Sequence, residues 1–166
     1  QERQSWLQIS YMKEAYHTMG PKFTLGWMAE ALYSSKNFSE NYTATMMQAG
    51  EFAPTPHSKL MYNEAFRANQ YVAAGIKPIY VLNDMFQFRT EFYGFTPIFP
   101  IKKNALNKAY YGKAFSRFEY MGEVSVICHL PFGAISAYVN HYSSPKKEWN
   151  VGLTLGWQLF NYRFIE

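Results

Sequence analysis

Hydrophobic and polar residues alternate with a period of two along most of the chain. In the clearest segment, from Phe115 to Leu130, the even positions carry Phe118, Tyr120, Val124 and Val126, whereas the odd positions carry Arg117, Glu119 and Glu123. Successive side chains of a β-strand point to opposite faces, so these charges share one face of a strand, whereas on a helix they would scatter around the axis. The pattern predicts a strand with one apolar and one polar face.

Six further segments show the same alternation and are predicted as strands. Most of the seven exceed the usual strand length of about five or six residues. The predicted fold class is therefore all-β and antiparallel, with about seven strands. With the first segment included, the predicted strands are Gln4–His17, Lys22–Lys36, Phe66–Val81, Met85–Phe95, Phe115–Leu130, Gly133–Tyr142 and Val151–Leu159.

The connections between these strands alternate between short and long. Residues 19–21, 83–84 and 130–132 form tight turns, whereas 36–65 and 96–113 are long and 143–149 is intermediate. Transmembrane barrels of bacteria have short periplasmic turns and longer external loops. A chain of seven strands with a periplasmic C-terminus would place every short turn on one side, so the loop lengths favour an antiparallel transmembrane β-barrel.

Alternation also divides the strand residues into two candidate sets for such a barrel. The polar set is predicted to line the lumen, where its charges could bind a partner segment, influence ion passage, or simply form cross-strand pairs. The apolar set is predicted to face lipid. The lumen candidates are Gln87, Arg89, Glu91, Arg117, Glu119 and Glu123; the lipid-facing candidates are Phe23, Leu25, Trp27, Phe86, Phe88, Phe118, Tyr120, Val124, Val126, Leu153, Leu155 and Trp157.

Aromatic residues gather at the predicted strand ends, as they do in the girdles at the two membrane interfaces of outer-membrane barrels. This clustering favours a membrane barrel over a soluble one, in which the apolar face would point inward. The aromatic residues at strand ends are Trp6, Phe23, Tyr33, Tyr80, Phe86, Phe92, Phe95, Tyr142, Trp149, Tyr162 and Phe164.

Seven strands are an odd number, whereas closed single-chain bacterial barrels usually have an even count. Either an eighth strand lies within Asn37–Leu60, or residues 1–166 are the C-terminal part of a larger barrel. We favour the larger barrel, with the barrel continuing upstream of residue 1 in the parent protein. Two alternatives remain open: a small closed porin-like channel, and a soluble lipocalin-like barrel or sandwich that binds an apolar ligand.

Composition supports finely interleaved apolar and polar residues. Aromatic residues make up 19% of the 166-residue chain and charged residues only 17%, with a mean hydropathy of −0.30. The net charge of +4 is spread along the chain without long basic runs, which argues against a nucleic-acid partner. The single cysteine, Cys128, excludes an internal disulfide and any multi-cysteine metal site.

The residues that hydrolytic catalysis requires are not grouped in this sequence. The only aspartate, Asp84, follows Asn83 in a predicted turn, and no Gly-x-Ser-x-Gly motif occurs. The four histidines lack the spacing of a metal site. We therefore expect no catalytic residue, metal or cofactor in these 166 residues, and whether the parent protein is an enzyme stays open.

Three segments, Tyr71–Pro78, Ser116–Asn140 and Leu159–Glu166, resemble the C-terminal barrel of patatin-like phospholipases from Bacteroidetes. Those barrels are similar to the BamA/TamA surface-antigen group, and the resemblance covers most of the chain from about Phe66 onward. It implies an upstream serine–aspartate esterase acting on lipids, with this segment as membrane anchor or translocation pore. The oxyanion glycines, the serine elbow and the catalytic aspartate of that family have no counterpart here.

The resemblance also implies a location and partners. The expected location is the outer membrane of a Gram-negative, Bacteroidetes-like bacterium, and the expected partners are outer-membrane lipids, the barrel-assembly machinery during insertion, and an upstream patatin domain or a homo-oligomer. The final strand of that family commonly ends in an aromatic residue that marks it for assembly. Here Phe160, Tyr162 and Phe164 alternate at the end, but Ile165 and Glu166 follow them.

Overall fold

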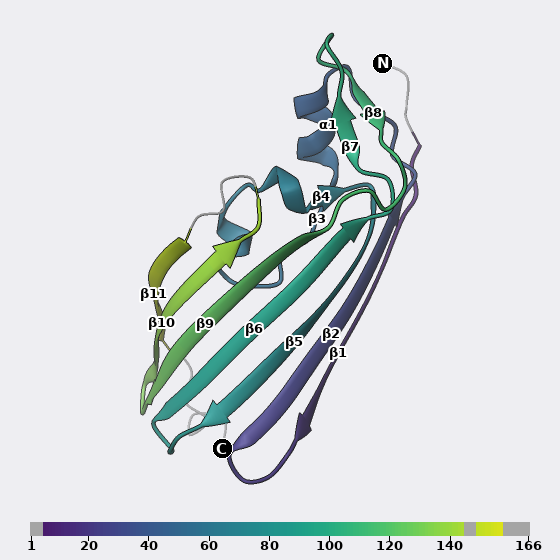
Figure 1. The fold of residues 1–166 in the computed structure, drawn as a ribbon. Coiled ribbons are helices and arrows are strands. Elements are labelled where there is room, and N and C mark those ends of the chain that lie inside the picture. The colour runs from purple at the N-terminus through teal and green to yellow at the C-terminus, as the bar shows by residue number, and fades with distance from the viewer. Residues whose placement is uncertain (1–4, 145–148, 158–166) are drawn as a thin grey trace.

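One antiparallel sheet of seven long strands dominates the computed structural model, which describes residues 5–144 and 149–157. Each strand pairs with the next long strand along the chain, so the sheet is a simple meander (Figure 1). The strands, in their order across the sheet, are β1 (Gln8–Thr18), β2 (Phe23–Ser34), β5 (Gln70–Val81), β6 (Phe86–Pro97), β9 (Glu119–Leu130), β10 (Gly133–Tyr142) and β11 (Trp149–Trp157).

The seven long strands confirm the predicted antiparallel β fold. β10 matches its predicted range, and the other boundaries shift by a few residues; β9, for example, begins at Glu119 rather than Phe115. The predicted last strand extended to Leu159, and residues beyond Trp157 lie outside the described part of the chain, as do Phe160, Tyr162 and Phe164.

The predicted short turns join strands at one end of the sheet. Between β1 and β2 the backbone N–H of Met19 donates to the Phe23 carbonyl at 2.8 Å, and Gly20 adopts a φ of +103°, which a residue without a Cβ tolerates. Between β5 and β6 the Asn83 side chain accepts a hydrogen bond from the Phe86 N–H at 2.8 Å. Such Asx hydrogen bonds close tight turns locally, which is why the sequence predicts them well.

The long connection between β2 and β5, which we call the inner segment (residues 35–69), contains short elements instead of an eighth long strand. These are α1 (Tyr42–Gln48), β3 (Gly50–Glu51), two single turns of 3-10 helix and β4 (Arg67–Ala68). β3 pairs only with β4, in a separate two-stranded sheet. The alternative of an eighth strand within Asn37–Leu60 is therefore wrong, because Asn41 caps a helix there and Pro54 and Pro56 cannot donate to a ladder.

The inner segment packs against one face of the sheet and forms the main apolar core. Phe52 and Phe66 are each 1% exposed and contact aromatic rings of β5 and β6. The Phe52 ring stacks on Phe95 with centroids 5.8 Å apart. We call the covered face the inner face and the opposite one the outer face. The core cluster comprises Met28, Leu32, Phe52, Ala65, Phe66, Ala68, Tyr71, Ala73, Tyr93, Phe95, Met121 and Tyr142.

A short hairpin projects beyond the sheet between β6 and β9 (Figure 1). It consists of β7 (Ile101–Lys103) and β8 (Ala109–Tyr111), and its buried Ile101 packs against Met46 and Ala49 at the end of α1. The predicted loop over residues 96–113 thus contains regular structure that the short apolar pattern there did not reveal.

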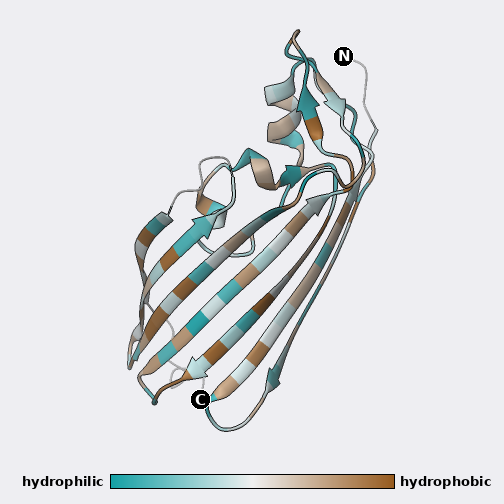
Figure 2. Cartoon of the chain, viewed as in Figure 1, coloured by the Kyte–Doolittle hydropathy of each residue, from teal (hydrophilic) through white to brown (hydrophobic). Residues whose placement is uncertain are grey.

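The two faces of the sheet differ sharply in polarity, and residues of opposite hydropathy alternate along the strands (Figure 2). The outer face carries aliphatic and aromatic side chains on every strand, many of them well exposed, such as Leu153 at 76% and Ile76 at 51%. Its one lysine or arginine in the described strands is Lys13 of edge strand β1. No other element of the described chain covers this face, whereas the inner face holds the charged side chains.

β1 and β11 form the two edges of the sheet. Within the described residues, β1 pairs with β2 alone and β11 with β10 alone, so the sheet is not closed on itself. In the same residues, no helix combines the length and hydrophobicity needed to cross a membrane.

Candidate functional site

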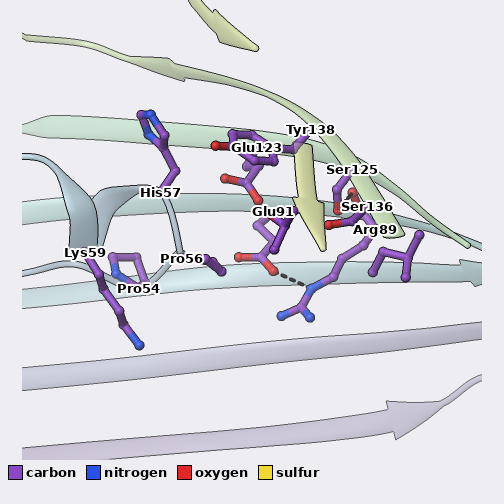
Figure 3. Close-up of a pocket in the computed structure, with 12 residues that line it drawn as sticks. Pro54, Pro56, His57, Lys59, Arg89, Glu91, Glu123, Ser125, Ser136 and Tyr138 are labelled. Carbon is purple, nitrogen blue, oxygen red and sulfur yellow. Dashed lines mark hydrogen bonds and ion pairs between the residues drawn. The ribbon is translucent and has the colours of Figure 1, made fainter. Parts of the chain in front are cut away.

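The polar half of the inner face is the candidate site, because there the inner segment and the strands enclose charged side chains. Residues 54–59 of the inner segment lie above β6, β9 and β10 and leave a cavity of about 260 Å³ (Figure 3). Its charged and titratable lining comes from two sources: His57 and Lys59 of the inner segment, and Arg89, Glu91, Glu123 and Tyr138 of the strands.

Glu91 and Glu123 face each other directly across β6 and β9. Both are largely buried, at 5% and 8% exposure. Two carboxylates in direct opposition repel each other unless neighbouring groups compensate their charge. Arg89 forms an ion pair with Glu91, the Tyr93 hydroxyl donates to Glu91, and the Asn140 amide donates to Glu123 at 3.5 Å, so neighbouring groups compensate both carboxylates.

A second cavity of about 370 Å³ lies between the inner segment and strands β1, β2 and β5. Lys77 of β5 reaches across β2 to form an ion pair with Glu14 of β1. The Tyr71 hydroxyl donates to Glu30 at 2.5 Å, and Arg67 pairs with Glu51 at 2.5 Å. The lining of this cavity thus contains charges of both signs, from Lys59 and Lys77 and from Glu14, Glu30 and Glu51.

His57 fixes the inner segment to the top of β10. Its Nδ1 lies 2.8 Å from the Tyr142 hydroxyl, and its ring lies 5.7 Å from that of Tyr138. Burial among these rings removes water from the imidazole, which lowers the pKa of His57 because the charged form is the one penalised. The neutral imidazole is thus the form that fits this position.

The predicted lumen candidates all lie toward the inner face. Gln87, Arg89, Glu91, Glu119 and Glu123 project from β6 and β9, with Gln87 bound to His129 at 3.2 Å and Glu119 bound to the Ser143 hydroxyl at 2.5 Å. Arg117 precedes β9 and donates to the Ala65 carbonyl at 2.8 Å. The structure therefore brings Arg89, Glu91 and Glu123 together at one cavity and places Arg117 and Glu119 elsewhere, near the end of the inner segment.

The predicted lipid-facing candidates occupy the outer face. Phe118 lies just before β9 and its ring covers Gly94, while Phe92 and Tyr120 stack with ring centroids 6.0 Å apart. The side chain of Trp157 lies outside the described part of the structure. The remaining candidates sit on β2, β6, β9 and β11: Phe23, Leu25, Trp27, Phe86, Phe88, Tyr120, Val124, Val126, Leu153 and Leu155.

Two of the aromatic residues expected at a membrane interface are instead inside the core. Phe95 and Tyr142 are 0% and 4% exposed and pack against Phe66 of the inner segment. Their assignment to an interfacial girdle is wrong, because strand ends alone do not distinguish the two faces.

The sequence analysis missed two residues of the inner segment that line the cavities, His57 and Lys59. No local pattern marks a loop that folds back onto a sheet.

Three of the four histidines contact side chains other than a serine or a cysteine. His57 contacts a tyrosine hydroxyl, His17 accepts from the Trp27 indole at 3.4 Å and His129 contacts Gln87, so none of these three activates a serine or cysteine. Among the described residues, no three His, Cys, Asp or Glu side chains lie so as to hold a metal ion.

Neither a protein-family description, nor a curated protein, nor a solved structure matches this chain.

Proposed function

We propose that residues 1–166 form part of a transmembrane β-barrel in the outer membrane of a Gram-negative bacterium. The observation that carries this proposal is the outer face: seven strands expose large apolar side chains there, and no described element covers them. A water-soluble protein rarely leaves an apolar surface of this extent uncovered. In lipid the same surface is stable, with the charged residues kept on the inner face.

Strand length supports a membrane location. β2, β5, β6 and β9 each contain 12 residues, and β1 contains 11. A tilted strand needs about 9–11 residues to cross the hydrocarbon core of a bilayer. The strands are thus long enough to span a membrane, and longer than most strands of soluble sheets.

The open edges imply that the proposed barrel contains further strands. The outer edges of β1 and β11 have no partner among the described residues, and hydrocarbon cannot hydrogen-bond free N–H and C=O groups. Additional strands from the parent protein, or from a second copy of it, would pair with these edges. The unpaired edges therefore favour a larger barrel over a small channel made by this segment alone.

The inner segment favours a membrane anchor over an open pore. Its aromatic side chains Phe52 and Phe66 are almost fully buried against the inner face, where Phe52 contacts the buried ring of Tyr71 in β5. A translocation pore would require this packed segment to move. By its resemblance to patatin-like phospholipases, we further propose that the barrel anchors an upstream lipid esterase, which the parent protein's sequence and its hydrolysis of phospholipids would test.

The soluble alternative reverses the roles of the two faces and makes a different prediction. A lipocalin-like barrel has an apolar interior and a polar exterior. Here the covered face contains Arg89, Glu91 and Glu123, while the uncovered face contains Val124, Leu153 and similar residues. This arrangement supports the membrane proposal over binding of an apolar ligand.

Cysteine labelling at two adjacent positions of β11 tests the proposal. Leu153 lies on the outer face and Thr154 on the inner face, and both are exposed in the folded chain. In a Cys128→Ser background, Leu153→Cys and Thr154→Cys are folded into phosphatidylcholine vesicles and treated with a water-soluble maleimide. We expect Thr154→Cys to react and Leu153→Cys to be protected. Equal labelling of both positions would contradict a lipid-facing outer face.

A further inference from the structure

The hairpin between β6 and β9 carries an uncompensated positive charge. The chain from residue 92 to 118 contains Lys102, Lys103, Lys108, Lys113 and Arg117 and no acidic residue. The four lysines are exposed, and within the described part of the chain none forms an ion pair.

The surrounding elements do not neutralise this charge. The Tyr42 N–H of α1 donates to the Asn107 carbonyl at the hairpin tip, which places Glu40 as an exposed acidic residue nearby. Glu64 accepts a hydrogen bond from the Tyr42 hydroxyl. α1 itself, Tyr42–Gln48, has no charged residue. The lysines therefore outnumber the acidic groups close to them, and the hairpin attracts anions.

Exposed aromatic residues connect the hairpin to the apolar outer face. The Phe118 ring covers Gly94 on that face, and a Cβ at Gly94 would lie 3.0 Å from the Phe118 ring. Next along this path, the Phe115 N–H donates to the Ile98 carbonyl at 2.9 Å, and the Phe115 side chain is 60% exposed. Tyr110 then lies opposite Lys102 in the hairpin. Apolar surface, aromatic rings and lysines thus follow one another from β6 to the hairpin.

The position of the hairpin places this sequence of groups at the level of lipid headgroups. β6 is 12 residues long and ends at Pro97, and β7 begins four residues later. Figure 1 shows the hairpin beyond the end of the long strands that lies opposite the short turns. If the outer face lies in hydrocarbon, the base of the hairpin enters the polar layer that flanks it on each side.

We propose that Lys102, Lys103 and Lys113 bind the phosphate groups of anionic membrane lipids, with Phe115 and Tyr110 at the hydrocarbon–water boundary. This inference rests on the proposed function. Lysine supplies a mobile point charge on an apolar stem, which suits headgroup phosphates beside a bilayer. Each basic residue near an anionic surface strengthens the attraction, and the attraction falls with salt. Because Phe118 lies on the uncovered apolar outer face next to this region, a lipid surface is favoured over a nucleic acid.

Lipid retention by the whole chain tests this proposal. The protein is transferred into mixed micelles with equal phosphatidylglycerol and phosphatidylcholine, and the retained lipids are counted by native mass spectrometry at low and high salt. A hairpin variant, K102Q/K103Q, is compared with K13Q/K22Q, which removes the same charge from β1 and from the short turn between β1 and β2. We expect an enrichment of phosphatidylglycerol of about tenfold at low salt, abolished in the hairpin variant and retained in the control.

Several outcomes would overturn the inference. The first three are equal retention of both lipids, an enrichment that survives in the hairpin variant, and an enrichment lost equally in the control. The fourth is competition by inorganic phosphate at the concentration of the lipid phosphate, which would indicate a site for free anions. Tighter binding of an oligothymidylate would indicate a nucleic-acid surface instead. Labelling of Leu153→Cys in pure phosphatidylcholine vesicles reports on membrane insertion alone, so failure of the proposed function is distinguished from failure of the hairpin site.

Discussion

Tyrosine rings lie against glycines of the neighbouring strand at three places on the inner face. The pairs are Tyr16 with Gly26, Tyr93 with Gly75 and Tyr138 with Gly152, and each pair is in direct register across two strands. A large ring can pack this closely on a strand only where the opposing residue has no Cβ. Because the Tyr93 hydroxyl also donates to Glu91, the ring is positioned next to the charged cavity.

The Tyr93–Gly75 contact predicts a loss of stability in Gly75→Ala. A Cβ at Gly75 would overlap the Tyr93 ring and lie 2.9 Å from the Phe92 carbonyl oxygen, and backbone cannot move away as a flexible side chain can. Overpacking of this kind costs about 1–3 kcal/mol, measured as a lower urea midpoint at unchanged m-value. Gly122→Ala is the matched control, because its nearest neighbours are 3.6 Å away; equal losses in both variants would contradict the steric argument.

His57 predicts a pH-dependent component of stability. Its pKa is lowered in the folded chain by burial, relative to about 6.5 in the unfolded chain. Between these two values the unfolded state binds more protons, so stability falls as the pH drops from 6.5 toward the folded pKa and is unaffected by this group above 6.5.

The difference in unfolding free energy between the native chain and His57→Phe, measured from pH 8 to pH 5, isolates this contribution. We expect the native chain to lose stability relative to the variant at acidic pH. A difference that stays constant over this range would show that the imidazole is not desolvated.

The inner segment is the element that distinguishes this chain from a bare sheet. Its Asn41 caps α1 by accepting from the Ala44 N–H at 2.8 Å, and Arg67 donates to the carbonyls of Met46, Met47 and Ala49 at the other end. These local hydrogen bonds shape the segment. Its attachment to the sheet comes from apolar packing, in which Phe52 contacts rings of Tyr71, Tyr93 and Phe95.

Phe52→Ala is therefore expected to release the inner segment from the sheet. Removal of a fully buried phenyl ring costs about 3–5 kcal/mol, which here weakens docking of residues 35–69. Limited proteolysis should then cut this segment much faster than in the native chain. Met47→Ala is the control within the same segment, since Met47 is 66% exposed. Unchanged cleavage in Phe52→Ala would mean that other contacts hold the segment.

At the scale of the whole molecule, the two sides of the sheet differ in polarity and in what covers them. The inner face is covered by the chain's own inner segment and contains its ion pairs, whereas the outer face is apolar and uncovered in the described residues. Exposed aromatic residues such as Tyr33, Tyr80, Phe118 and Trp149 lie near the ends of the outer face. This polarity is opposite to that of a soluble barrel, and it underlies the proposal of a membrane location.

A charge introduced on the two faces of β11 should have unequal effects. Leu153→Arg places a guanidinium on the outer face, and Thr154→Arg places one on the inner face. In lipid, arginine near the bilayer midplane costs about 2–4 kcal/mol, so we expect Leu153→Arg alone to be strongly destabilised. The measurement is urea unfolding of protein folded in phosphatidylcholine vesicles. Similar small effects of both substitutions would argue for an aqueous outer face.

The strands, their two-faced character and the short turns between them follow from the local sequence. These features depend on neighbouring residues: alternation sets the faces of β9 and β10, and Asn83 closes its turn through a hydrogen bond three residues away. Local geometry imposes them whatever the rest of the chain does. The separation of Glu91 and Glu123 from Phe92 and Val124 onto opposite faces could be predicted in this way.

Contacts between residues far apart in the sequence could not be predicted from local patterns. Nothing in the local pattern of residues 35–69 indicates that Phe52 packs on β5 and β6, that His57 reaches Tyr142, or that Phe95 is buried rather than exposed at a strand end. The partners in these contacts are separated by up to 85 positions in the sequence. The physical reason is that the inner segment follows the path that removes the most apolar surface from water. The sheet surface on which it packs exists only once the sheet has formed.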